Sequence, residues 1–86
     1  MSGKIIGKVT HFYNQIGVVV VVLSGAIELG DQVHFLGRHT DFQQQIHSMQ
    51  IDHQSVPAAE KGQEIAIKVE QRVRNHDKVY KLIEDE

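Results

Sequence analysis

Histidine is the residue type in this 86-residue chain best suited to metal binding or to acid–base chemistry near neutral pH. The spacing of the histidines matches no recognised ligand motif such as His-Glu-x-x-His, and there is no cysteine to supply a thiolate. We expect the three that lie on expected strands, His11, His34 and His47, to face outward, although closure of a barrel could bring some together. We therefore expect no metal site and no cofactor. The six histidines are His11, His34, His39, His47, His53 and His76.

Catalytic machinery is hard to find in this sequence. Asp52 and His53 are neighbours that could act together as an oriented general base. Nucleophilic catalysis would also need a serine or cysteine held on a strained turn, and Ser48 and Ser55 have ordinary surroundings. The chain lacks the G-x-x-x-x-G-K-S/T pattern of a phosphate-binding loop. We expect a protein that is not an enzyme and that binds no nucleotide.

Basic residues gather in the last third of the chain, although the formal net charge of −2 argues against tight, nonspecific nucleic-acid binding. Two interpretations stay open, a solvated charged rim and a basic face for RNA or an acidic partner. The second interpretation gives a candidate phosphate-contacting patch built from strand and loop residues. Few aromatic residues are available to stack on bases. The candidate patch consists of Arg38, Lys61, Lys68, Arg72 and Arg74.

Residues 18–23 form an apolar run of five valines and a leucine between Gly17 and Ser24. The fold has to protect such a run from solvent. β-branched side chains favour a strand, and an apolar run bracketed by turn residues is typical of a strand that is apolar on both faces. On an open edge such a strand would promote aggregation, so we expect the sheet to close on itself. One set of alternate side chains must face outward and could meet another protein or a second copy. We assign this interaction face to Val19, Val21 and Leu23, with Val18, Val20 and Val22 as the alternative set.

Further strands are expected at residues 6–13, 32–36, 42–51, 64–70 and 78–83, separated by turn residues. The clearest alternation directs Ile65, Ile67 and Val69 inward. Ile46 and Met49 are an odd number of residues apart, so both can face inward only if the strand is interrupted by a bulge. The sequence therefore predicts an all-β fold, a small closed antiparallel barrel of roughly six strands. It forms one domain, residues 1–86, with an ordered core at about 4–83.

The order of these segments resembles the second, β-barrel domain of translational GTPases such as elongation factor Tu and initiation factor two, and short translation-elongation-factor-like proteins. The chain also resembles the C-terminal barrel of the collagenase-like peptidase family. The resemblance implies the fold of translation-factor domain 2, with nucleotide or peptidase chemistry in other domains. The turn at residues 75–77 departs from the Gly-Asp usual in that family. The segments that carry the resemblance are IGKV (6–9), GVVVV (17–21), IELGDQV (27–33), IHSMQ (46–50), VPAAEKGQEIAI (56–67) and DKVY (77–80).

These observations together predict a non-catalytic binding module that docks on RNA, the ribosome or a protein partner. The alternative is an accessory protein-interaction subunit of a larger peptidase or RNA-modifying enzyme. The first residues contain no apolar run long enough for a signal peptide, and the valine run is too short to span a bilayer. Without cysteine the chain cannot use disulfides, so we expect a cytoplasmic protein without membrane contact.

Overall fold

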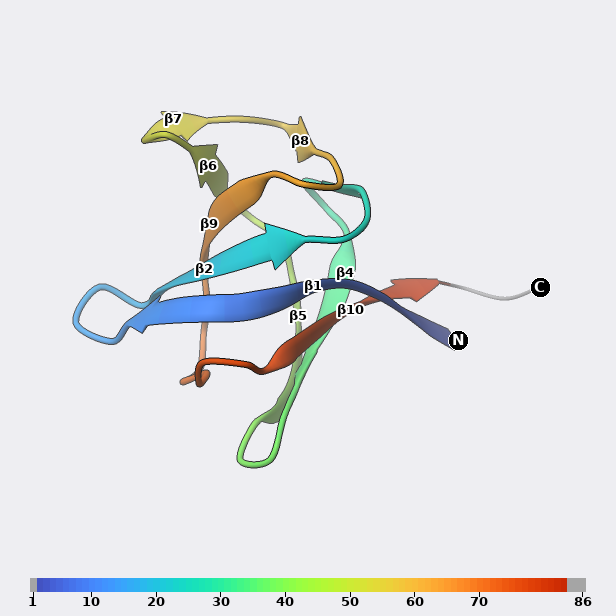
Figure 1. The fold of residues 1–86 in the computed structure, drawn as a ribbon, viewed down its shortest axis with the longest axis vertical. Helices are drawn as coiled ribbons and strands as arrows, with labels where there is room; N and C mark the ends of the chain where they lie inside the picture. The colour runs from blue at the N-terminus through green and yellow to red at the C-terminus, as the bar shows by residue number, and fades with distance from the viewer. Residues whose placement is uncertain (1, 84–86) are drawn as a thin grey trace.

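A computed structural model describes residues 2–83, and this range contains ten strands and no helix (Figure 1). Every strand pairing in it is antiparallel. The all-β expectation is thus confirmed for the described range, while residues 1 and 84–86 of the expected domain lie outside it. The strands are β1 (Ser2–Tyr13), β2 (Val18–Leu23), β3 (Ile27–Glu28), β4 (Gln32–Leu36), β5 (Asp41–Gln45), β6 (Met49–Ile51), β7 (Gln54–Ser55), β8 (Ala58–Ala59), β9 (Glu64–Lys68) and β10 (Lys78–Ile83).

Eight strands form one sheet in the order β5-β4-β10-β1-β2-β9-β6-β7, and β3 pairs with β8 in a separate ribbon. The first and last strands of the sheet, β5 and β7, do not pair with each other within residues 2–83. The predicted closed six-stranded barrel is therefore not confirmed: the sheet has eight strands and its backbone pairing is open. The valine strand β2 still avoids an edge, because it lies between β1 and β9.

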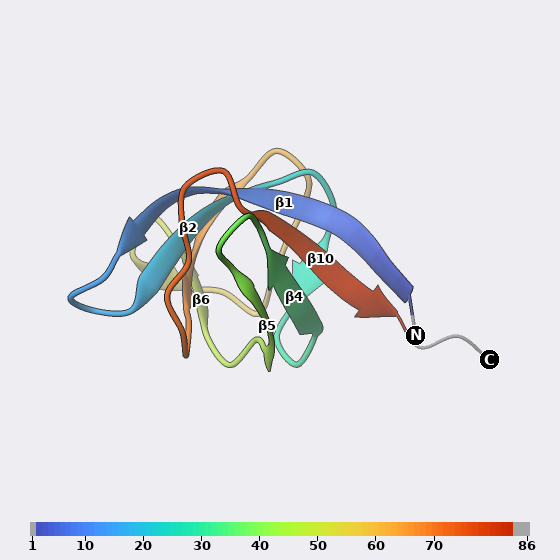
Figure 2. The ribbon, with the colours of Figure 1, turned by 90° about the horizontal axis from the view of Figure 1, so that it is seen from below.

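The long strand β1 curves across the molecule and pairs with two strands (Figure 2). Its first part pairs with β10 and its second part with β2, and the register shifts between Ile5 and Gly7 on one side and between Val9 and His11 on the other. Each irregularity adds a residue and increases the local bend. Two buried residues three positions apart, Ile6 and Val9, can consequently face the same core.

The valine strand has the opposite orientation to the one we expected. Val19, Val21 and Leu23 are buried, with 0%, 0% and 3% of their surfaces exposed, so their assignment as an outward interaction face is wrong. The cause is the pairing with β9, where Val19 lies opposite Ile67 and Val21 opposite Ile65. Residues directly opposite on paired strands share a face, so the inward set of β9 fixes the inward set of β2. The predicted inward positions of Ile65, Ile67 and Val69 are confirmed.

The long segment expected at residues 42–51 is divided into β5 and β6, and the connection at 46–48 keeps both Ile46 and Met49 in the core. A short hairpin, β6–β7, follows and is closed by Asp52 and His53, both with positive φ. Two consecutive positive φ values are typical of the tight hairpin turns whose twist matches that of paired strands. This hairpin was missed at the sequence level because its second turn residue is His53 where Gly is usual.

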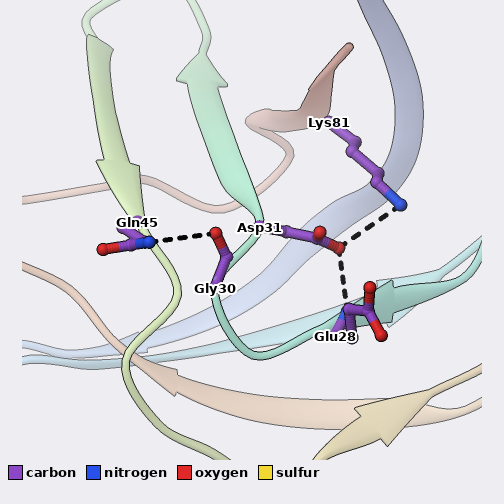
Figure 3. A network of polar contacts seen from close by, with 5 residues as sticks. All are labelled: Glu28, Gly30, Asp31, Gln45 and Lys81. Atoms are coloured by element: carbon purple, nitrogen blue, oxygen red, sulfur yellow. Dashed lines mark hydrogen bonds and ion pairs between the residues drawn. The ribbon is translucent and has the colours of Figure 1, made fainter. Parts of the chain in front are cut away.

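A polar network holds the turn between β3 and β4 against two other strands (Figure 3). Asp31 Oδ2 accepts a hydrogen bond from the Glu28 backbone N–H at 2.9 Å and lies 3.4 Å from Nζ of Lys81 on β10. The amide of Gln45, at the end of β5, donates to the Gly30 carbonyl at 3.1 Å. Gly30 in this turn adopts φ +92°, a conformation that favours glycine.

Candidate functional site

The tip of the β1–β2 hairpin projects apolar side chains beyond the end of the sheet. The turn at residues 14–17 is closed by the N–H groups of Ile16 and Gly17, which both donate to the Tyr13 carbonyl. Gly17 adopts φ +66°, a conformation that costs glycine little. The turn leaves Ile16 62% exposed and Tyr13 49% exposed, and the Tyr13 ring lies 4.3 Å from the His11 ring, centroid to centroid.

The connection from β9 to β10, residues 69–77, runs beside this hairpin and is tied to it at both ends. The Val69 N–H donates to the Gly17 carbonyl at 2.9 Å, and the His76 N–H donates to the Val9 carbonyl at 2.8 Å. The turn at its end is held by Asp77, whose buried carboxylate accepts the Arg74 backbone N–H at 2.8 Å. The hairpin and the connection therefore form one firmly attached surface.

Three adjoining hollows lie in this surface, with volumes of about 330, 310 and 380 Å³. Phe12 and Asn14 line all three, so the hollows share a common centre. We call the surface around them the hairpin-tip site. One hollow is bordered by the aromatic and apolar side chains of the hairpin, and the other two by the 69–75 segment. The site comprises Phe12, Tyr13, Asn14, Ile16, Arg72 and Arg74.

The five predicted basic residues do not form one patch. Arg72 and Arg74 line the same hollow. Arg38 follows Gly37, which packs against the Asp77 carboxylate, and it does not line this hollow. Lys68 borders a different hollow, with Gln44 and His47.

Lys61 lies far from the hairpin tip. The turn that carries it is tied to the end of β2 by the Gly62 N–H, which donates to the Leu23 carbonyl. The hairpin tip lies at the beginning of the same strand. Six residues at about 3.3 Å each put roughly 20 Å between these two ends. Lys61 therefore cannot join Arg72 and Arg74 in contacting a small group.

The histidines stay apart, and residues 2–83 contain no cluster of three or more His, Asp or Glu able to hold a metal ion. His34 pairs with Asp41 on the outward side of β4 and β5, where the Asp41 side chain is largely exposed. Asp52 and His53 border a hollow with Glu64 but have no serine or cysteine beside them there. Within residues 2–83, the hollow that Asp52 and His53 border thus offers no hydroxyl or thiol side chain that could act as a nucleophile beside His53.

Four members of the hairpin-tip site were not identified from the sequence: Phe12, Tyr13, Asn14 and Ile16. Their only local signal is a turn containing asparagine and glycine next to aromatic and apolar residues. The site appears only when residues 12–16 meet residues 69–75, which are more than fifty positions away along the chain. Arg72 and Arg74 were included among the candidates, because charge can be read directly.

The fold is that of a small all-β domain, and comparisons with known proteins relate it to parts of peptidases. The chain is 35% identical over 80 residues to an uncharacterized protease of Methanocaldococcus jannaschii, a match covering 92% of the chain and 20% of that protein. It is 32% identical over 79 residues to a collagenase of Porphyromonas gingivalis, covering 90% of the chain and 22% of that protein. The chain thus spans about a fifth of the length of the curated relatives it matches. No protein-family model matches it.

Solved structures show the same fold. The chain superposes with a TM-score of 0.86 on the C-terminal domain of a Geobacillus thermoleovorans protein whose name assigns it to the U32 peptidases. The match covers 91% of both chains at 22% identity. A selenomethionine variant of that domain gives a TM-score of 0.84. Of the two resemblances expected from the sequence, the one to the barrel of collagenase-like peptidases is supported.

The other resemblance must be corrected. The relatives found are a protease, collagenases and a U32 peptidase domain, so the expectation of a translation or elongation factor is wrong. Docking on RNA or the ribosome, which was expected from that resemblance and from the basic residues, receives no support from these relatives. Among the described residues, none belongs to a helix that could cross a bilayer.

Proposed function

We propose that this chain is a non-catalytic protein-interaction module that serves as an accessory part of a larger peptidase. The sequence relatives support this, because the matching region makes up only a fifth of a protease and of a collagenase. The fold relative supports it as well, because it is one domain of a U32 peptidase. In this proposal the peptidase chemistry belongs to a separate catalytic unit.

The observation that carries the proposal is the exposed apolar tip of the β1–β2 hairpin. Ile16 is 62% exposed, and the large, partly exposed ring of Tyr13 stands beside it. Apolar and aromatic side chains of this kind dominate the binding energy of protein interfaces once a partner covers them. The hairpin turn is held by the backbone hydrogen bond from Val69 to Gly17, so it can present these side chains without ordering a flexible loop.

Two finer expectations belong to the same proposal. We propose a cytoplasmic location, which the absence of cysteine favours. We also propose that the sheet works as a closed barrel, with the buried side chain of Gln44 joining β5 to the segment after β9. The Gln44 amide donates to the Lys68 carbonyl at 3.0 Å and accepts from the Glu70 N–H at 2.9 Å, across the gap that the backbone pairing leaves.

The test is a titration of the full chain with a U32-type peptidase from the same organism, followed by calorimetry. We expect a one-to-one complex, and Ile16→Glu should weaken it by about tenfold or more, because a charge would replace an apolar contact. Leu29→Glu is the matched control: Leu29 is 43% exposed but lies in the β3–β4 turn, outside the site, and its replacement should leave binding unchanged. Absence of a complex, or equal effects of both variants, would refute the proposal.

The absence of catalysis needs its own assay. The purified chain alone should not hydrolyse peptide, ester or nucleotide substrates above background. Turnover that persists through purification and is abolished by His53→Ala would overturn this part of the proposal.

A further inference from the structure

The two arginines of the hairpin-tip site have no carboxylate partner among the described residues. The ion pairs present in residues 2–83 join His34 to Asp41 and Lys81 to Asp31, and neither involves Arg72 or Arg74. The buried carboxylate of Asp77 is already engaged by the Arg74 backbone. Two guanidinium groups that bind no carboxylate within residues 2–83 therefore border one hollow of about 380 Å³, together with the amides of Asn14 and Asn75.

The apolar half of the site lies next to these arginines. Phe12 packs partly against the core and lines all three hollows. Ile16 and Tyr13 border the hollow on the hairpin side. A ligand that fills the site must therefore carry anionic groups beside an apolar group, and it must be long enough to cross adjoining hollows.

We propose that the hairpin-tip site binds an extended acidic segment of a protein partner. Its carboxylates bind Arg72 and Arg74, and an apolar side chain next to them packs on Phe12 and Ile16. This inference rests on the proposed function and specifies which part of the partner is recognised. Guanidinium and carboxylate match as two parallel hydrogen bonds, which makes arginine the better choice than lysine for such a contact.

An acidic peptide fits the charges of the molecule better than a nucleic acid does. A phosphate backbone needs basic groups along a continuous track, and Lys61 lies at the opposite end of β2. Glu70 borders the site next to Arg72 and confines its positive charge to a short stretch, which suits one or two carboxylates better than a long phosphate chain.

The test measures fluorescence anisotropy of three labelled probes with the full chain. The first is a short peptide that repeats Glu-Ser-Leu-Glu, the second has Gln in place of every Glu, and the third is single-stranded polyuridylate of equal length. At low salt the acidic peptide should bind about tenfold more tightly than the Gln peptide, with the preference shrinking as salt rises. Equal binding of the two peptides, or binding of polyuridylate as tight as that of the acidic peptide, would overturn the proposal.

Two charge-reversal variants then locate the effect. R72E/R74E should reduce the affinity for the acidic peptide to that for the Gln peptide. K4E/K61E changes the net charge by the same amount at positions far from the hairpin tip and should retain most of the preference. R72K/R74K keeps the charge but lacks the planar guanidinium groups, so its affinity for the acidic peptide should fall by about threefold. Because this variant is conservative, it also controls for misfolding of R72E/R74E. An equal loss in R72E/R74E and K4E/K61E would refute a local site.

This inference and the proposed function can fail separately. The peptide assay needs no peptidase, so acidic-peptide binding without a peptidase complex would leave the inference standing and remove the proposed function. A peptidase complex that neither R72E/R74E nor the acidic peptide disturbs would support the proposed function and remove the inference.

Discussion

Replacement of Gln44 tests how the open sheet is held together. Gln44 is only 3% exposed, although it is polar and lies on β5 at the edge of the sheet. Its amide joins β5 to the Lys68 carbonyl at 3.0 Å and to the Glu70 N–H at 2.9 Å. One side chain thus supplies the donor and the acceptor that a neighbouring strand would supply.

Gln44→Leu keeps most of the side-chain volume and removes both hydrogen bonds. A hydrogen bond contributes roughly 0.5–1.5 kcal/mol net, so the free energy of unfolding should fall by about 1–3 kcal/mol. A chain of this length has roughly 4–13 kcal/mol in total, which makes the loss a substantial fraction. At about 4–8 °C per kcal/mol the melting temperature should fall by roughly 5–20 °C.

Thermal and urea unfolding measure the loss, and amide hydrogen exchange at Glu70 shows whether this bridge causes it. The Glu70 amide should exchange faster in Gln44→Leu. Gln43→Leu is the control, because Gln43 is the neighbouring glutamine on the exposed face of β5, and its replacement should change stability by less than about 0.5 kcal/mol. If Gln44→Leu is as stable as the wild type and Glu70 stays protected, the side chain does not hold the sheet together, and the closed-barrel proposal loses its support.

Three further substitutions test packing and backbone geometry in the β4–β5 and 74–77 turns, each by urea unfolding. Gly37→Ala should lower the free energy of unfolding by at least about 2 kcal/mol, because a Cβ there would overlap the carboxylate of Asp77. Gly3→Ala is the control: its Cβ would meet only ordinary contacts, and the loss should be less than half as large. Thr40→Val should be neutral or stabilising by up to about 1 kcal/mol, since the buried Thr40 hydroxyl has no hydrogen-bond partner among residues 2–83; a clear loss would reveal a hidden partner. His76→Gly should stabilise by roughly 1 kcal/mol by relieving its positive φ of 75°, and destabilisation would show that the His76 side chain makes a needed contact.

The valine strand shows which part of the fold can be predicted from sequence and which part cannot. Its bounds were predicted correctly, because turn residues bracket a run of β-branched side chains. Its inward face was assigned wrongly, because alternation gives no phase when every side chain is apolar. Which side chains of β2 face inward is decided by β9, where charged and apolar residues do alternate. Val22 pairs with the outward-facing Glu64 and therefore faces outward as well. Correct assignment therefore requires the register between two strands that are forty residues apart.

The candidate site was predicted only in part for a related reason. The basic residues were grouped by their nearness along the chain and by strand alternation. Arg72 and Arg74 do line one hollow, but they lie in the connection after β9 and not on a continued strand. Lys61 was included although the sheet places it at the other end of β2. Phe12 and Asn14 were missed, since nothing local marks them as the meeting point of the hairpin with residues 69–75.

The mistaken resemblance to translation factors has a physical cause in the same turns. Two of the segments that suggested it contain Gly30 and Gly62, with φ of +92° and +91°, positions where glycine is favoured by backbone geometry. A chain that follows this path needs a left-handed residue there whatever its function. Such motifs therefore carry information about the fold and none about the partner. Evidence on the partner has to come from side chains that the fold leaves exposed, which here are Ile16 and the two arginines beside it.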